Sequence, residues 1–166
     1  MARMGAQEGI SWLVRTITPV ELQARFPKLG GGNYKRASLA TARYNCLAFA
    51  CGDERKWWEP RPGGRFYWPP NAQKDTSLAT VTRIFIADGY VETAYRNVEA
   101  GYLKAAIYVD LEDIDTYSHV AMSDGAVWKS KLGKGQDIEH DSLDLLEGNQ
   151  EAEYGIVATI LRKAIQ

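Results

Sequence analysis

The chain has 166 residues, of which 45% are hydrophobic and 25% are charged. This length and composition are those of one soluble globular domain with a substantial core. Its 20 basic and 21 acidic side chains give a formal net charge of −1, so no global field would recruit nucleic acid or an anionic membrane. No apolar run approaches the roughly 20 residues that a membrane-spanning helix needs.

Residues 1–9 carry no apolar segment behind their charge and therefore do not form a Sec signal. The expected location is the cytoplasm, although export by a specialised secretion system would leave no such trace in the sequence. Two cysteines are too few for a disulfide framework. With two histidines, no HExxH segment and no paired CxxC, the sequence predicts neither a metal site nor a cofactor.

The first half of the chain predicts helices separated by loops. Thr18 and Pro19 suit the cap and first position of a helix over residues 19–26, and a glycine-rich link follows at residues 30–32. Residues 33–41 are expected to form a loop, before a helix that begins near Asn45 and ends at Gly52. We expect a single domain over residues 1–166, divided into an N-terminal helix and link (1–32) and a core (33–166).

Residues 57–70 are rich in tryptophan and proline. The prolines forbid a regular helix or a central strand, so this segment is expected to be an ordered loop. Its aromatic side chains either pack on the domain or line a substrate cleft. The cleft candidates are Trp57, Trp58, Tyr67 and Trp68.

After a helix over residues 77–88, the remainder of the chain is predicted to be mostly strand. Strands are expected at residues 90–95, 102–109, 117–122, 126–131 and 156–161, with a hairpin turn at 123–125 and a short helix at 141–146. Helices followed by an antiparallel sheet indicate an α+β fold.

Cys46 and His119 are the residues most suggestive of chemistry. Cys46 opens the second helix, where unpaired backbone N–H groups and the helix dipole favour thiolate over thiol. His119 lies on a strand, and a histidine within hydrogen-bond reach would activate the thiol as a base. The structural alternative is a buried helix cysteine and a strand histidine held by a backbone carbonyl. Cys51 is interpreted as a small core residue.

The sequence also resembles a known group of proteins. Residues 44–50 (YNCLAFA), the tryptophan-proline loop, residues 118–121 (SHVA) and residues 128–133 (WKSKLG) resemble a family of bacterial domains with a YNCxAxA signature. More distantly, the chain is similar to NlpC/P60 and CHAP amidohydrolases. The resemblance covers roughly residues 44–161 and implies a papain-like cysteine hydrolase fold, with Cys46 as nucleophile and His119 as base. It supplies no substrate.

A third catalytic residue would hold the imidazole in its tautomer and stabilise its charged form. Asp137 ranks first for this role, His140 second and Ser130 third. His140, expected at the start of a solvated helix, is also an alternative base for Cys46.

An oxyanion hole would combine the backbone N–H of Cys46 with a donor from Asn45 or Tyr44. The competing role of Asn45 is to cap the helix that Cys46 opens.

Two functions of different classes are compatible with these residues. The first is a cysteine hydrolase that cleaves an amide bond through a thioester, acting as a peptidase, amidase or deamidase on a peptide, protein or peptidoglycan substrate. The second is a non-catalytic papain-like binding module that uses the tryptophan-proline loop as its interaction surface. A cognate protein partner or inhibitor, and a cytosolic effector or toxin role, are compatible with a single small domain.

Overall fold

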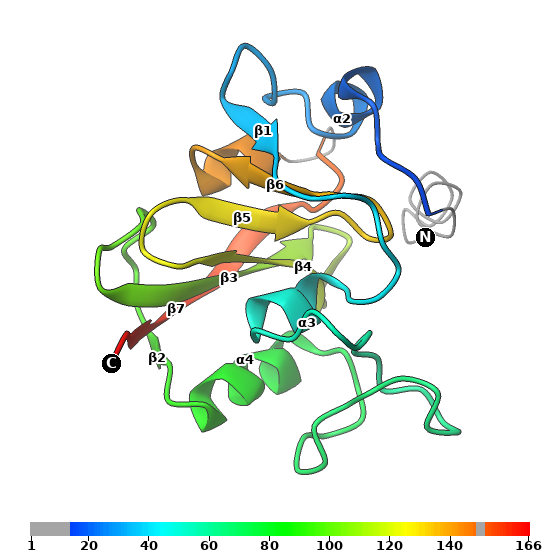
Figure 1. The fold of residues 1–166 in the computed structure, drawn as a ribbon. Coiled ribbons are helices and arrows are strands. Elements are labelled where there is room, and N and C mark those ends of the chain that lie inside the picture. Colours follow the sequence, from blue (N-terminus) through cyan, green and yellow to red (C-terminus); the bar gives the residue numbers. More distant parts are fainter. Residues whose placement is uncertain (1–13, 149–151) are drawn as a thin grey trace.

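The computed structural model describes residues 14–148 and 152–166, and its centre is one antiparallel sheet (Figure 1). Seven strands pair in the order β1-β6-β5-β4-β3-β7-β2. They are β1 (Tyr34–Arg36), β2 (Val91–Glu92), β3 (Tyr102–Asp110), β4 (Asp113–Ser123), β5 (Trp128–Lys131), β6 (Asp137–His140) and β7 (Ile156–Ala164). The α+β fold with an antiparallel sheet is therefore confirmed.

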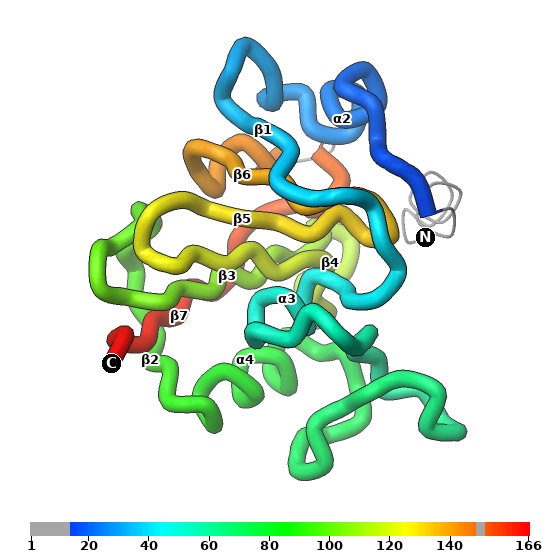
Figure 2. Tube along the Cα trace, in the orientation of Figure 1, coloured from blue at the N-terminus to red at the C-terminus, as the bar shows by residue number. Residues whose placement is uncertain are grey.

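Helices are few and short in the described residues. They are α2 (Pro19–Arg25), α3 (Cys46–Ala50), α4 (Leu78–Ala87) and the 3₁₀ helix η1 (Leu143–Leu146). Both α3 and α4 lie on the same side of the sheet, below its central strands, whereas α2 lies near β1 and β6 at one edge of the sheet (Figure 1). The trace in Figure 2 shows the tryptophan-proline segment extending outward beyond α3 and α4. No helix of this described part combines the length and apolarity that crossing a bilayer requires.

Two apolar clusters fill the two faces of the sheet, because alternate residues of a strand point to opposite sides. Ala105, Ile107 and Val120 face α3 and α4 and pack with Leu47 and Phe85. The residues between them in the strands face the other way. That second cluster contains Phe26, Ala106, Tyr108, Ala121, Trp128, Ile138, Leu146 and Tyr154.

The predicted helices form where the capping residues indicated. The side-chain oxygens of Thr18, Asn45 and Ser77 accept hydrogen bonds from the backbone at the starts of α2, α3 and α4. The loop predicted over residues 33–41 is wrong in part, since β1 pairs with β6 in the register Tyr34↔His140. A polar three-residue edge strand carries no hydrophobic alternation, so the pattern does not show it.

The predicted strands β3, β4, β5 and β7 are confirmed, whereas the segment after β5 differs from expectation. Residues 137–140 form the strand β6, in which His140 is fully buried, and not a solvated helix start. Only the following 3₁₀ helix η1 remains of the helix expected over residues 141–146. The strand expected over 90–95 shortens to β2. The prediction for residues 1–9 lies outside the described residues.

The tryptophan-proline segment is irregular but ordered by its own backbone contacts, as predicted. The N–H of Glu59 donates to the carbonyl of Tyr67, and the N–H of Tyr67 donates to the carbonyl of Trp57, at 2.9 and 3.1 Å. The Trp58 ring packs on the Tyr67 ring with centroids 4.9 Å apart. These contacts close the loop between Trp57 and Tyr67 into a defined shape.

Candidate active site around Cys46

Asn45 fixes the start of the helix that carries Cys46. Its Oδ1 accepts from the N–H of Ala48 at 3.1 Å, and its Nδ2 donates to the carbonyl oxygen of Trp58 at 2.7 Å. Asn45 is therefore a helix cap and a tie to the tryptophan-proline loop. The thiol of Cys46 occupies the first position of a short helix whose entry is held on two sides.

The sulfur of Cys46 lies where β4 and β5 separate. The ladder between these strands contains only Met122↔Lys129 and Ser123↔Trp128, and its continuation would place Val120 opposite Lys131. The backbone N–H of Val120 instead hydrogen-bonds the Cys46 sulfur. The thiol thus interacts with a backbone N–H that a longer β4–β5 ladder could have used, and that N–H belongs to the residue after His119.

Burial raises the pKa of the Cys46 thiol above its ordinary value. Opposing influences come from the N–H group of Val120, the charge of Lys131 and the N–H groups of Leu47 and Cys46 itself, all of which favour the thiolate. Cys46 still keeps some exposed surface. The thiol therefore rests in its protonated form, and not as the preformed thiolate that its helix position alone suggests.

His119 lies on the sheet face that carries Tyr108 and Tyr154. Its ring stacks on Tyr154 with centroids 4.0 Å apart and an angle of 5° between the rings, and it is 1% exposed. Burial lowers the pKa of His119 well below its ordinary value, and the neighbouring His140 and Arg25 lower it further. Burial likewise lowers the pKa of His140 to about 4. Both imidazoles are therefore neutral near pH 7.

A chain of three hydrogen bonds assigns the protons of these neutral rings. His140 Nδ1 lies 2.9 Å from the carbonyl oxygen of Ser142, which can only accept, so Nδ1 carries the proton. His140 Nε2 then accepts from the Ser130 hydroxyl at 2.9 Å. With its only proton used there, Ser130 Oγ accepts from His119 Nε2 at 2.8 Å. His119 Nδ1 is consequently the unprotonated nitrogen, and no hydrogen bond in the described residues occupies it.

The partner of His119 is therefore Ser130, with His140 behind it, and not Asp137. Asp137, which ranked first from the sequence, accepts from the Tyr44 hydroxyl at 2.9 Å through Oδ2. The period-two alternation of β5 and β6 explains this outcome, because Ser130 pairs with Ile138 on one face while Lys131 pairs with Asp137 on the other. No hydrogen bond joins Cys46 to either histidine in the part of the chain that the structure describes.

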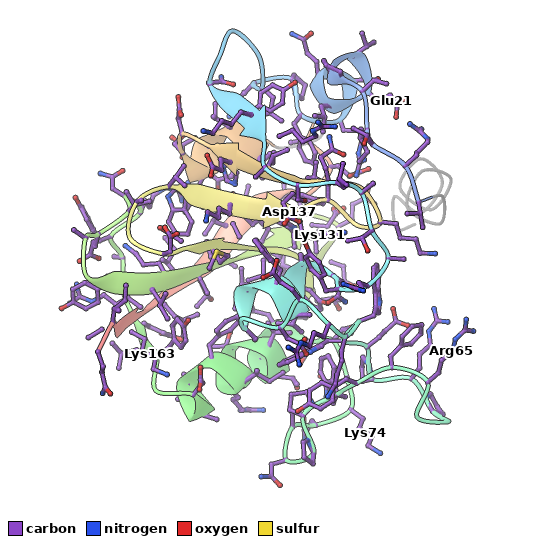
Figure 3. The ribbon with its side chains drawn as sticks, viewed as in Figure 1. Glu21, Arg65, Lys74, Lys131, Asp137 and Lys163 are labelled. Atoms are coloured by element: carbon purple, nitrogen blue, oxygen red, sulfur yellow. The ribbon has the colours of Figure 1, made fainter. Side chains whose placement is uncertain are left out.

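Lys131 and Asp137 lie together on the side of the sheet that faces α3 (Figure 3). Lys131 is fully buried. Its ammonium donates to the carbonyl oxygens of Thr41, at 2.8 Å, and Gly133. Residues far away in sequence cover this side chain, which local patterning cannot reveal.

The side chains proposed for the oxyanion hole are engaged elsewhere. The amide of Asn45 is used by Ala48 and Trp58, and the hydroxyl of Tyr44 donates to Asp137. Backbone N–H groups at the start of α3 and on Val120 are the donors directed at the sulfur. An oxyanion that forms on a carbon attached to this sulfur would meet these backbone donors first.

The aromatic cleft candidates are all half-buried. Trp58 Nε1 donates to Asp53 at 2.8 Å, and Trp68 Nε1 donates to the carbonyl of Gln73 at 2.7 Å. Trp58 and Trp68 also pack against the cluster beneath α3 and α4. A recess of about 380 Å³ opens further along, between residues 69–73 and one side of α4.

In the described residues, no group of three or more His, Cys, Asp and Glu side chains is placed to hold a metal ion. Cys46 and Cys51 are both free thiols. The chemistry that these described side chains offer is therefore that of a thiol, two neutral imidazoles, a hydroxyl and a buried ammonium.

The arrangement defines an α+β domain with a cysteine at a helix start and, on the sheet, a buried hydrogen-bonded chain of two histidines and a serine. The family model described as Domain of unknown function (DUF7689) matches residues 35–162, which is most of the chain. The chain belongs to this family. No curated protein matches it, and no solved structure matches it.

Proposed function

We propose that the protein is a cysteine hydrolase with a papain-like fold, in which Cys46 attacks an amide carbonyl and His119 accepts the thiol proton. The observation that carries this proposal is the hydrogen-bond chain from His119 through Ser130 to His140. It leaves Nδ1 of His119 unprotonated, and the residue after His119 binds the Cys46 sulfur through its backbone N–H. The candidate base and the residue whose N–H interacts with the candidate nucleophile are thus consecutive in β4.

The reaction starts from the neutral pair, because burial disfavours both thiolate and imidazolium. As the sulfur–carbon bond forms, the thiol proton moves to His119 Nδ1 and the carbonyl oxygen becomes an oxyanion. The imidazolium then gives its proton to the leaving amine as the carbon–nitrogen bond breaks, which leaves a thioester on Cys46. Water attacks the thioester with His119 again as base, and the acid and the thiol are released.

Ser130 and His140 hold His119 in the tautomer that this cycle needs. A carboxylate partner would stabilise the imidazolium strongly, whereas a hydroxyl orients the ring with a weaker electrostatic effect. Stacking on Tyr154 restricts the ring plane further. In this proposal the Ser130 hydroxyl and the Tyr154 ring orient His119 as a neutral base, and no permanent ion pair with a carboxylate is needed.

The substrate in this proposal is an amide of a peptide, a protein side chain or peptidoglycan. An amine in place of water would convert the same thioester into a transfer product. The test is a panel of peptide, glutamine-bearing protein and peptidoglycan substrates, with mass spectrometry to detect an acyl adduct. We expect turnover and an adduct on Cys46 that vanish in Cys46→Ser and persist in the matched variant Cys51→Ser. Turnover that survives Cys46→Ser would refute the proposal.

The second candidate is a non-catalytic papain-like module that binds a partner through the tryptophan-proline loop. The recess between residues 69–73 and α4 favours it, because proline and aliphatic side chains line it together with a few polar ones. Iodoacetamide labelling separates the two candidates. A nucleophilic Cys46 reacts faster than Cys51, whereas equal slow labelling of both thiols favours the binding module.

A further inference from the structure

Lys131 is a buried cation that takes no part in the reaction proposed above. Its side chain is inaccessible to solvent, and a buried charge costs free energy unless its surroundings compensate for it. Two of its three N–H groups donate to the carbonyls of Thr41 and Gly133. The ammonium also lies 5.1 Å from the centre of the Tyr44 ring, within the range of a cation–π contact.

The remaining ammonium N–H has no acceptor in the described residues. The anionic groups that act on Lys131 are Asp137 and Cys46 in its thiolate form. Asp137 already receives the Tyr44 hydroxyl on Oδ2, and its Oδ1 is a buried oxygen without a hydrogen-bond partner. The ammonium is thus held by neutral carbonyls, and the charges of the Asp137 carboxylate and the Cys46 thiolate both act on it.

The register of the sheet explains why this cation faces the thiol. Continuing the β4–β5 ladder would pair Lys131 with Val120, and Val120 is the residue whose N–H binds the Cys46 sulfur. The ladder ends before this point, and both the Val120 N–H and the Lys131 charge act on the thiol. Figure 3 shows Lys131 and Asp137 next to each other above α3.

We propose that Lys131 is a positioning residue for the hydrolase reaction, whose buried ammonium stabilises the thiolate of Cys46 from the side of the sheet opposite His119. This inference rests on the proposed function. The ammonium compensates the negative charge that develops on sulfur when the thiol proton leaves, and again when the thioester is cleaved. In this scheme His119 accepts the thiol proton, and the positive charge of Lys131 stabilises the thiolate.

The other described titratable groups that interact with the Cys46 sulfur are not cations. They are Tyr117, Tyr154 and Cys51, each of which senses the charge of Cys46. Each of these groups is neutral in its protonated form, and burial raises the pKa of each. Asp137 faces Lys131 from β6 and would by itself oppose a second negative charge.

The test is the pH dependence of Cys46 alkylation by iodoacetamide in a Cys51→Ser background. Lys131→Gln removes the charge, while its amide N–H groups can still donate to the two carbonyls. We expect its alkylation rate to be about tenfold lower than the reference at pH 7, as a thiol pKa higher by about one unit predicts. The deficit should narrow toward pH 10.5, because the thiol then ionises without help and Lys131 loses its proton.

Lys129→Gln is the matched control, since Lys129 lies on the same strand and pairs with Asp124 at the surface. It should leave the profile unchanged. Lys131→Met is a second uncharged variant. It replaces Lys131→Gln in the test if circular dichroism shows that Lys131→Gln does not fold. The inference would be overturned if either folded Lys131 variant were alkylated as fast as the reference protein at pH 7. It would also be overturned if the alkylation rate were lowered by the same factor at every pH.

Alkylation does not depend on a substrate, so the two proposals fail separately. A wild-type protein that cleaves no amide but loses alkylation rate in Lys131→Gln would refute the hydrolase alone. A protein that cleaves amides with an unaltered pH profile in Lys131→Gln would refute the role of Lys131 alone.

Discussion

The side chain of Asn45 joins the start of the Cys46 helix to the backbone of Trp58. Its Nδ2 lies 2.7 Å from the Trp58 carbonyl oxygen, while its Oδ1 receives the N–H of Ala48 at 3.1 Å. Trp58 is bonded in turn to Asp53 through its indole N–H. The tryptophan-proline loop therefore positions the helix start whether or not its aromatic rings ever contact a substrate.

Replacing Asn45 by alanine tests this link. We expect Asn45→Ala to lower the free energy of unfolding by about 1–2 kcal/mol, because a cap is lost and the Trp58 carbonyl loses its donor. Alkylation of Cys46 should change as well, since the helix start can shift. Urea denaturation and iodoacetamide labelling measure the two effects. Ser77→Ala removes the equivalent cap of α4 and should alter stability alone. If both variants leave Cys46 labelling intact, the link has no part in placing the thiol.

The two cysteines should respond differently to serine. Cys46→Ser is expected to abolish turnover while leaving the melting curve nearly unchanged, because a serine hydroxyl is close in size to the thiol and can accept from the Val120 N–H. Cys51 ends α3 and packs against the apolar cluster beneath it, and burial raises its pKa to about 12. Cys51→Ser should cost about 1–3 kcal/mol of stability, for burial of a hydroxyl, and should keep turnover. The reverse pattern would identify Cys51 as the functional thiol.

Ser130→Ala should affect both chemistry and stability. It leaves His119 Nε2 and His140 Nε2 without a partner in a buried site, at a cost of roughly 1–3 kcal/mol for each group. The tautomer of His119 is then no longer fixed, so kcat should fall even where the protein is fully folded. Ser123→Ala is the control, because Ser123 is buried on the same strand as His119 and, among the described residues, its hydroxyl accepts only the Gly125 N–H. Equal kcat values for the two variants would remove Ser130 from the mechanism.

Local signals in the sequence were sufficient for most of the fold. Thr18, Asn45 and Ser77 cap helices where capping chemistry predicts them, and the turn at residues 123–125 separates the strands that it was expected to separate. These features depend on residues within a few positions of one another. The edge strand β1 depends on pairing with the distant residues 138–140 and has no local signature.

The site shows the same division between local and distant causes. The placement of Cys46 at a helix start is local and was predictable. The choice between Ser130 and Asp137 depends on the register of β5 against β6, which decides the face on which each side chain lies. The burial of Lys131 and His140 depends on segments that approach from elsewhere in the chain. A one-residue shift in the assumed register of β5 or β6 moves each side chain to the opposite face, so a prediction of which residue contacts His119 is reversed.

The buried histidines should make the protein sensitive to acid. The pKa of His140 is lowered to about 4 in the folded protein, against 6.5 as its ordinary value. Between these pH values the unfolded state binds more protons, so stability rises with pH through this window and is lost as the pH falls from 6.5 toward 4. A shift of this size corresponds to roughly 3 kcal/mol at the acid end.

His140→Gln removes this titration while keeping a donor and an acceptor at the position. Urea denaturation at pH 7, 5.5 and 4.5 should show the wild type losing more stability than His140→Gln over this range. His119 contributes in the same direction and is present in both proteins. Parallel loss of stability in the two proteins would mean that His140 is charged at no cost in the folded state.

Lys131 should produce the corresponding effect on the alkaline side. Burial lowers its pKa from 10.5 to about 8 in the folded protein, although Asp137 and Cys46 act to raise it. Between pH 8 and 10.5 the unfolded state therefore binds more protons, and the contribution of Lys131 to stability rises with pH by up to roughly 3 kcal/mol. The free energy of unfolding of the wild type, measured relative to Lys131→Gln, should increase from pH 7.5 to 10, because the neutral amine no longer costs desolvation. Lys129→Gln, whose lysine lies at the surface, should show no such increase relative to the wild type. If the difference between the wild type and Lys131→Gln stays constant across this range, the ammonium is not buried as a charge in the folded protein.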